Sequence, residues 1–350
     1  MNKHIYFIFT LLCVSCNQHR ESINYFTDVK TILEYDSIYS DKNDEVVGIM
    51  SLDKFKNYLI SYNRKSDYLF SFYDTKKGVL SEKWGHRGQG PNEFIDVSRI
   101  SILDYQLVFT DQPKREIIYV PIEHILSKEK NVNIRRYSYP YTADFRPYHV
   151  EIINDYKIAI GAFKDSRFGV LDKENNIIQY QSDFPFNYEE ISGIFRSVTF
   201  QSNIKSNSEQ SKFVISTYNS DIFEIYQIMD TGEIVRIYLN PFNHIPKIKP
   251  TPGRNSGFSV DRDRSIGGLV NMAVTNDFIF FIYTSETSAK SSSSGHLSNE
   301  ILCFNWNGEK IRKYILPFPI NAITLCVDNE YIYGSKEYEN ETVIYRFKIV

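Results

Sequence analysis

Short apolar runs that alternate with polar positions recur along most of the chain, and this pattern is typical of half-buried β-strands. Two kinds of turn separate the runs. The first kind carries Asn or Asp beside an aromatic or acidic residue, as in Asp104-Tyr105 and Asn154-Asp155. The second kind is longer and rich in Asp, Asn and Gly, as in Asp230-Thr231-Gly232. These residues favour tight hairpins, so the pattern predicts four-stranded β units.

The units repeat at a spacing of about fifty residues, which is in the range of β-propeller blades. Their first strands are expected to begin near Val46, Val97, His149, Ile194, Gly268 and Asn321. Helical periodicity is not sustained anywhere, and the best helical segment is the short stretch Ile122–Lys130. The sequence therefore predicts an all-β fold, a six-bladed β-propeller of four-stranded blades.

The last unit is short, because residues 322–349 supply only three strand-like runs. Val29–Tyr35, near the other end of the chain, is a strand-like run that belongs to no unit. If this segment is the outermost strand of the last blade, it closes the ring and removes an exposed sheet edge. We therefore expect the N-terminal strand to close the last blade.

Composition agrees with a β-rich globular protein. Hydrophobic residues make up 42% of the chain, and the 26 Tyr and 25 Phe suit pleated, half-buried surfaces. The formal net charge is only −3. A dedicated nucleic-acid binder would show a basic patch or stripe, so we expect no nucleic-acid partner.

The first residues carry a targeting signal. Lys3 and His4 precede an apolar run, Ile5–Val14, which is too short to span a membrane and has the length of a signal-peptide core. The segment Leu12–Cys16 resembles a bacterial lipobox, which implies cleavage before Cys16 and lipidation of its thiol. The alternative is an ordinary secretory signal with an incidental Cys16.

On the lipoprotein interpretation, residues 1–16 are the signal peptide, residues 17–27 are a tether, and residues 28–350 form one propeller domain. No later segment reaches transmembrane length, so the lipid would be the membrane anchor. Two cysteines remain in the body, Cys303 and Cys326, and both lie in apolar strand-like runs. We expect buried free thiols there rather than a disulfide.

One segment, Trp84–Phe94, combines three Gly with a Pro, which specifies a tight path for the chain. Its motif residues are Arg87, Gly88, Gly90, Pro91, Asn92, Glu93 and Phe94. This segment resembles the G-x-G-P-x-E-F signature of TolB-like six-bladed β-propeller lipoproteins of Gram-negative bacteria, which are related in architecture to NHL-repeat propellers. The resemblance implies the fold and export to the cell envelope, with an anchor in the outer membrane. It leaves the activity open.

Two roles are open for the motif loop. Arg87, Asn92 and Glu93 could form a polar site between the first two blades. The interpretation that we favour is structural: Glu93 accepts backbone N–H bonds, Gly88 and Gly90 adopt conformations unfavourable for other residues, and Phe94 is buried.

Propellers commonly bind ligands at the central channel, where the innermost strands converge. The polar residues expected there are Arg99, His149, Glu151, Arg196, Asn271 and Asn321. Two Arg could hold a carboxylate or phosphate in bidentate fashion. The alternative is that these side chains line a water-filled channel.

Two functions follow from these residues. The leading hypothesis is a non-catalytic binding or scaffold protein of the cell envelope, which recognises a protein or small ligand with one face. The second is a metal-dependent lyase or hydrolase with a cage of His149, Glu151, Asn271 and Asn321. Neither a paired CxxC nor an HExxH motif occurs, so no cofactor or structural metal is predicted.

Overall fold

The computed structural model describes residues 22–41, 48–129, 131–181, 183–189, 191, 193–251, 257–339 and 341–349. The predicted signal peptide with Cys16 lies outside these residues, as does Val46, the predicted start of the first unit. Within the described ranges, no helix has the length and apolar character that crossing a membrane would require.

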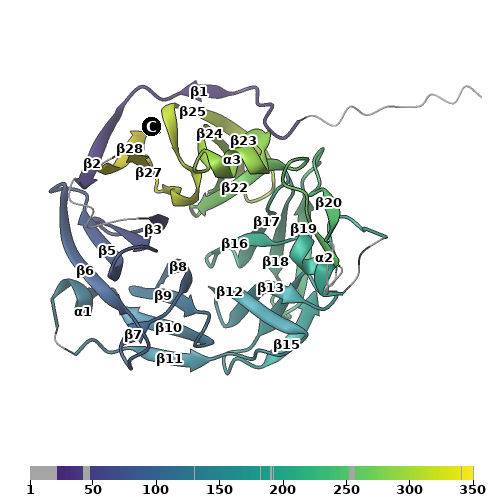
Figure 1. The fold of residues 1–350 in the computed structure, drawn as a ribbon, viewed down its shortest axis with the longest axis horizontal. Coiled ribbons are helices and arrows are strands. Elements are labelled where there is room, and N and C mark those ends of the chain that lie inside the picture. Colours follow the sequence, from purple (N-terminus) through teal and green to yellow (C-terminus); the bar gives the residue numbers. More distant parts are fainter. Residues whose placement is uncertain are drawn as a thin grey trace, which may run out of the picture.

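Six sheets of mainly antiparallel strands form a ring around a central axis (Figure 1). In each of the first three blades, successive strands run from the axis outward. Blade 1 contains β3 (Ile49–Phe55), β4 (Tyr58–Asn63), β5 (Tyr68–Asp74) and β6 (Val79–Arg87), extended by the short β7 (Glu93–Phe94). Blade 2 contains β8 (Val97–Leu103), β9 (Gln106–Asp111), β10 (Glu116–Pro121) and β11 (Arg135–Ser138). Blade 3 contains β12 (Phe145–Ile153), β13 (Tyr156–Phe163), β14 (Phe168–Leu171) and β15 (Ile177–Gln181).

The remaining blades follow the same order. Blade 4 contains β16 (Ser202–Asn207), β17 (Lys212–Thr217), β18 (Phe223–Ile228) and β19 (Ile234–Leu239). Blade 5 contains β22 (Ile266–Val274), β23 (Phe278–Thr287), β24 (Leu297–Asn305) and β25 (Lys310–Asn321). Blade 6 contains β26 (Cys326–Val327), β27 (Tyr331–Tyr338), β28 (Glu341–Lys348) and, from the N-terminal side of the chain, β2 (Tyr35–Asp41). The predicted six-bladed all-β propeller is confirmed.

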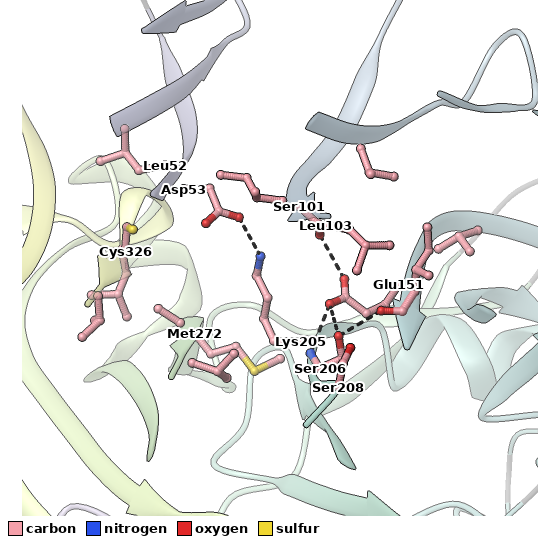
Figure 2. A pocket seen from close by; sticks show the side chains of 18 residues that line it. Leu52, Asp53, Ser101, Leu103, Glu151, Lys205, Ser206, Ser208, Met272 and Cys326 are labelled. Atoms are coloured by element: carbon pink, nitrogen blue, oxygen red, sulfur yellow. Dashed lines mark hydrogen bonds and ion pairs between the residues drawn. The ribbon is translucent and has the colours of Figure 1, made fainter. Parts of the chain in front are cut away.

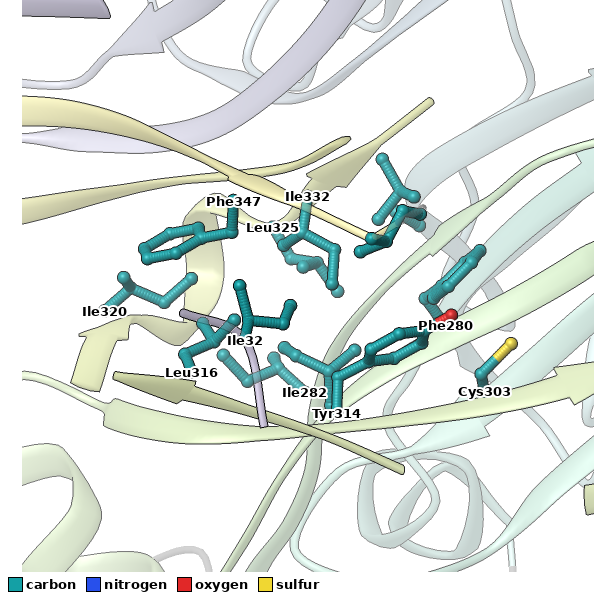
Figure 3. Close-up of a cluster of buried hydrophobic side chains, with 14 of the residues drawn as sticks. Ile32, Phe280, Ile282, Cys303, Tyr314, Leu316, Ile320, Leu325, Ile332 and Phe347 are labelled. Carbon is teal, nitrogen blue, oxygen red and sulfur yellow. The ribbon is translucent and has the colours of Figure 1, made fainter. Parts of the chain in front are cut away.

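The last blade is closed by the N-terminal strand, as predicted, but the closing segment lies further along the chain. β2 pairs antiparallel with β28, while β1 (Val29–Thr31) pairs in parallel with β25 of blade 5. The placement of Val29–Tyr35 on the last blade was therefore wrong except at Tyr35. The reason is Ile32, which is buried in the core between blades 5 and 6 and so holds the segment against blade 5 (Figure 3).

The packed body also begins earlier than residue 28. Ile23 and Phe26 are only 2% and 7% exposed, and they pack against blade 5 beside Phe304 and Trp306. The ring centres of Phe26 and Phe304 are 5.4 Å apart in an edge-to-face arrangement. The end of the predicted tether, residues 17–27, thus belongs to the packed domain.

Hydrophobic clusters fill the spaces between neighbouring blades. Figure 3 shows the one between blades 5 and 6, where Ile282, Leu316 and Phe347 meet. Cys303 and Cys326 are buried and free, as the sequence predicted. Because apolar faces of adjacent sheets pack on one another, the inner strands are held in fixed positions around the axis.

Short helices and turns decorate the ring. They are α1 (Ile122–Leu126), α2 (Ile194–Thr199), α3 (Ser288–Ser293), the 3₁₀ turn η1 (Ala322–Thr324) and the hairpin β20 (Ile248–Thr251) with β21 (Gly257–Val260). The predicted start of the fourth blade at Ile194 was wrong, because α2 occupies this position and the inner strand β16 begins at Ser202.

Candidate functional site

A cavity of about 220 Å³ lies at the centre of the ring (Figure 2). All six inner strands or their ends contribute to its wall. One residue from each blade in turn is Asp53, Ser101, Glu151, Lys205, Met272 and Cys326. Since each blade supplies part of the wall, the site exists only when the ring is complete.

The lining residues lie toward the C-terminal ends of the inner strands, where each strand turns into the next. Ser208, in the turn after β16, is exposed and also lines the cavity. The cavity therefore opens to solvent on this face of the propeller. Lys54 and Asp328, whose charged atoms are 3.0 Å apart, form an ion pair next to the lining residues Asp53 and Val327.

Both carboxylate oxygens of Glu151, in the wall of the cavity, accept hydrogen bonds from protein groups. Its Oε1 accepts from the hydroxyl and the backbone N–H of Ser206 at 2.7 and 3.1 Å. Its Oε2 accepts from Ser101 Oγ at 3.2 Å and lies 3.3 Å from His149 Nε2. Glu151 on blade 3 thus ties together blades 2, 3 and 4.

The two members of the His149–Glu151 pair have pKa values that match this geometry. Burial lowers the pKa of His149 below its ordinary value, although the hydrogen bond with Glu151 opposes this effect. Burial by itself would raise the pKa of Glu151. The hydrogen bond from His149 and the charge of Lys205 outweigh it, so the pKa of Glu151 lies below its ordinary value. The pair is best described as a neutral imidazole that donates to a carboxylate.

Asp53 and Lys205 form an ion pair at the wall of the cavity (Figure 2). Lys205 Nζ lies 3.7 Å from Asp53 Oδ2, which is longer than a hydrogen bond. The other carboxylate oxygen of Asp53 accepts from the backbone N–H of Lys54 at 2.8 Å. Burial raises the pKa of Asp53, while the charge of Lys205 opposes the shift.

A cross-channel contact forms a second polar layer. Arg99 on blade 2 donates to Asn271 Oδ1 of blade 5, on the opposite side of the ring, at 3.1 Å. It also donates to the hydroxyl of Tyr218 at 2.6 Å, and that hydroxyl donates to Asn203 Oδ1. Because Arg99 precedes the cavity-lining Ser101 on β8, this layer lies on the side of the cavity away from Ser208.

The structure brings four of the six predicted channel residues to the centre. Arg99, His149, Glu151 and Asn271 all lie on inner strands. The expectation that Arg196 lies on an inner strand was wrong: Arg196 is on helix α2, donates to the carbonyl of Ile191 at 3.0 Å and is 4.0 Å from Asp165.

Asn321 is also not on an inner strand. It ends the outer strand β25, and its side chain accepts from the backbone N–H of Ile323 to cap η1. Asn271 donates to the carbonyl of Ile323 at 2.8 Å and accepts from Arg99. Both polar atoms of the Asn271 side chain and the side-chain oxygen of Asn321 therefore bond protein atoms. Among the described residues there is no group of three or more His, Cys, Asp or Glu suited to a metal ion.

The prediction missed several polar residues of the centre. These are Asp53, Ser101, Asn203, Lys205, Ser206 and Tyr218. Three of the six lie on β16, which the sequence prediction started eight residues too early. The run Ser202–Asn207 has one apolar residue, Ile204, so no alternation of apolar and polar positions marks β16 in the sequence.

The motif loop lies between blades 1 and 2, and its polar groups bind protein atoms. Arg87 donates to the carbonyls of Ile95 and Arg64 at 2.8 and 2.6 Å. Lys114, from blade 2, donates to the carbonyls of Gly90 and Glu93 at 3.1 and 2.7 Å. These bonds hold the loop to both blades.

Inside the loop, Glu93 Oε2 accepts from the backbone N–H of Gly90 at 2.8 Å, as the sequence predicted for this carboxylate. A Cβ at Gly88 would overlap that carboxylate. The prediction for Gly90 was wrong, because its φ is not positive. A Cβ at this position would be crowded only by the side chain of Glu93. The predicted burial of Phe94 is confirmed, with 0% exposure and Arg136 over its ring.

Two further motif residues, Pro91 and Asn92, lie on the exposed side of the loop. The carbonyl of Pro91 accepts from Arg136 at 2.9 Å. Asn92 is exposed and, with Trp84 and His86, lines a second hollow of about 520 Å³ beside α1. Of the residues expected to form a polar site here, only Asn92 faces a cavity.

The radial sheets and the axial cavity define a six-bladed β-propeller with a central site. A family model described as TolB-like 6-blade propeller-like matches residues 35–330. The chain belongs to this TolB-like family.

Two solved structures from Bacteroides are similar in fold. One is a member of the DUF4221 family from Bacteroides vulgatus, with a TM-score of 0.58, 13% identity, and 91% of this chain and 97% of that chain covered. The other is an exported-protein candidate from Bacteroides fragilis, with a TM-score of 0.57, 15% identity, and coverage of 91% and 95%. No curated protein matches the sequence significantly.

Proposed function

We propose that this protein is an exported, lipid-anchored propeller of the cell envelope that binds a small ligand in its central cavity without transforming it. The observation that carries the proposal is the cavity itself. It is walled by all six blades, open at Ser208, and lined by both charged and apolar side chains. Concave sites of this kind, with a few convergent polar groups, are the usual ligand sites of proteins.

The state of the polar groups favours binding over catalysis. Glu151, with four protein donors around it, is poorly placed to take a proton from a substrate. Burial raises the pKa of the Cys326 thiol well above its ordinary value, which favours the unreactive protonated form. The wall therefore offers recognition rather than an activated nucleophile.

Export and anchoring rest on the N-terminal sequence. Ile5–Val14 has the length of a signal-peptide core, and Cys16 follows it at the lipobox position. The similar fold of the Bacteroides fragilis exported-protein candidate is consistent with export. We therefore infer a location in the envelope of a Gram-negative bacterium, with the lipid at Cys16 as the contact with the membrane.

The binding role is tested by closing the mouth of the cavity. Ser208→Trp places a large ring at an exposed turn, where the cost in stability is small. Native mass spectrometry of protein incubated with an envelope small-molecule extract should detect a bound compound on the wild type and on the matched control Ser293→Trp. It should detect none on Ser208→Trp. If Ser208→Trp and the wild type bind the compound to the same extent, the compound does not bind in the central cavity.

The anchor is tested separately with Cys16→Ser. The wild type should partition into the detergent phase and the membrane fraction, and the variant should be released into the aqueous phase. Unchanged partitioning of Cys16→Ser would show that Cys16 is not lipidated and would leave the binding role untouched.

A further inference from the structure

The chemistry of the ligand can be narrowed from the polar groups that the protein leaves open. Glu151 is not one of them, since Ser206, Ser101 and His149 already occupy both of its oxygens. A carboxylate that accepts this many bonds is held in place by the protein. Other polar groups of the wall must therefore bind the ligand.

Lys205 retains open donors. An ammonium group carries three N–H donors. Within the part of the chain that the structure describes, Lys205 Nζ has one long hydrogen bond, 3.4 Å to the carbonyl of Ile100, and the 3.7 Å contact with Asp53. At least one N–H of Lys205 is free to bind a ligand atom in the cavity.

Asp53 retains an open acceptor beside this donor. Its Oδ1 is used by the N–H of Lys54, and its Oδ2 forms an ion pair with Lys205 at 3.7 Å, which is longer than a usual hydrogen bond. The side chains of Asp53 and Lys205 are 24% and 19% exposed, so both are reachable from the cavity. A ligand atom that both accepts and donates a hydrogen bond would bridge them.

Charge excludes two classes of ligand. A carboxylate or phosphate bound to Lys205 would lie beside the carboxylate of Asp53 and near that of Glu151, and burying like charges together is costly. An ammonium group bound to Asp53 would lie beside Lys205 and meet the same penalty. A neutral hydroxyl group meets neither penalty, because it accepts from Lys205 and donates to Asp53.

The rest of the wall fits the same class of ligand. Ser208 lines the cavity at its mouth, and Leu52, Met272 and Leu325 contribute apolar surface. A compound with several hydroxyl groups and apolar C–H faces matches both kinds of wall. The volume of about 220 Å³ limits this compound to a small molecule.

We propose that the central cavity binds a small neutral polyhydroxyl compound, a sugar or polyol, with one hydroxyl group bridging Lys205 and Asp53. This inference rests on the proposed function, because it assigns the ligand class of the same cavity.

The test uses probes that share one ring and differ in charge. Calorimetric titration of the full mature chain compares the neutral probes D-glucose, D-galactose, D-mannose and myo-inositol with cationic D-glucosamine and anionic D-glucuronate. At least one neutral probe should bind, and it should bind at least about tenfold more tightly than either charged probe. The proposal is overturned if no neutral probe binds at millimolar concentration, or if a charged probe binds more tightly than every neutral one.

Two variants should shift the preference of the cavity for cationic or anionic probes in opposite directions. Lys205→Met removes the cation between the carboxylates of Asp53 and Glu151. It should therefore weaken binding of the neutral probe and strengthen binding of D-glucosamine. Asp53→Asn removes the neighbouring anion of Lys205, so it should favour D-glucuronate. Lys290→Met, on the exposed helix α3, serves as the matched control and should keep the wild-type order. An unchanged order of probes in Lys205→Met and Asp53→Asn would contradict the bridging hydroxyl.

The two proposals can fail separately. If the mass-spectrometric experiment finds a charged compound that Ser208→Trp excludes, the binding function stands and the neutral-ligand inference falls. If Ser208→Trp leaves occupancy unchanged and no neutral probe binds to the wild type, both fall.

Discussion

The Gly88–Phe94 loop and the central cavity are both rich in polar groups, but they differ in how those groups are satisfied. In the loop, Lys114 donates to two carbonyls and the Glu93 carboxylate accepts from Gly90. In the cavity, Lys205 and Asp53 form an ion pair at 3.7 Å, and Lys205 Nζ makes only one further, long hydrogen bond among the described residues. The difference separates polar residues that hold the fold from polar residues that are available to a ligand.

The loop also has an apolar side, which packs in the core between the first two blades. Phe94 is fully buried against Trp84 and Phe109, with ring centres 5.4 and 5.0 Å away. The loop therefore closes the core between blades 1 and 2. We expect substitutions there to change stability, and substitutions in the cavity to change binding.

The largest expected effect is that of Phe94→Ala. Removing a fully packed ring leaves a cavity between the first two blades, so the free energy of unfolding should fall by about 3–5 kcal/mol. Chemical denaturation measures this loss. Ligand occupancy of the folded fraction should not change, and a variant as stable as the wild type would contradict the role of Phe94 in the core.

A smaller effect is expected for the glycines of the loop. Gly88→Ala places a Cβ in the space of the Glu93 carboxylate, which must move and break its bond to Gly90, at about 1–3 kcal/mol. Gly90→Ala places its Cβ 3.0 Å from the same carboxylate and should cost less than about 1 kcal/mol. Thermal melts rank the two variants, and an equal or reversed order would contradict this account.

Lys114→Met should have an effect of about 1 kcal/mol, because it removes two charge-assisted hydrogen bonds from blade 2 to the loop. Its Met side chain keeps the apolar stem, so packing is largely retained. Lys76→Met, in an exposed turn of blade 1, is the control. If both variants unfold at the same denaturant concentration, the loop is held by packing alone.

The repeat of strands and turns was enough to predict the six blades, because each blade ends in turns with characteristic residues. Asp104, Tyr105 and Asn154 indeed have positive φ, as hairpin turns of this kind require. The closing strand was misplaced because Val29–Tyr35 and Tyr35–Asp41 are both strand-like. Only the burial of Ile32 between blades 5 and 6 distinguishes them, and that contact depends on the tertiary structure.

The error at the fourth blade accounts for half of the polar central residues that the site prediction missed. Ile194–Phe200 favours a strand because five of its seven residues are β-branched or aromatic. In the structure this segment is helix α2, and Ser197 bonds the backbone of Phe163 at its N–H and carbonyl. A tertiary contact thus overrides local propensity, and Arg196 was chosen in place of Lys205. Where the inner strand was placed correctly, as for Arg99 and Glu151, the predicted residue lies at the centre.

The smallest effect concerns pH and the bound carboxylate of the cavity. His149 is buried on β12 beside Glu151, with Arg99 and Lys205 as the nearby cations, and burial lowers its pKa below the ordinary value of 6.5. As pH falls through 6.5, the unfolded chain takes up a proton that the folded chain does not, so the protein loses stability. The lowered pKa of Glu151 adds a loss of the same sign at lower pH, below its ordinary value of 4.5.

His149→Gln keeps a donor near Glu151 and removes the titrating imidazole. Melting temperatures measured from neutral to mildly acidic pH should therefore fall less steeply in this variant than in the wild type. His296 is half buried and its pKa is also lowered, so His149→Gln alone should flatten the curve only in part, and the double variant with His296→Gln should flatten it further. If the curve of His149→Gln is as steep as that of the wild type, burial does not lower the pKa of His149 in the folded protein.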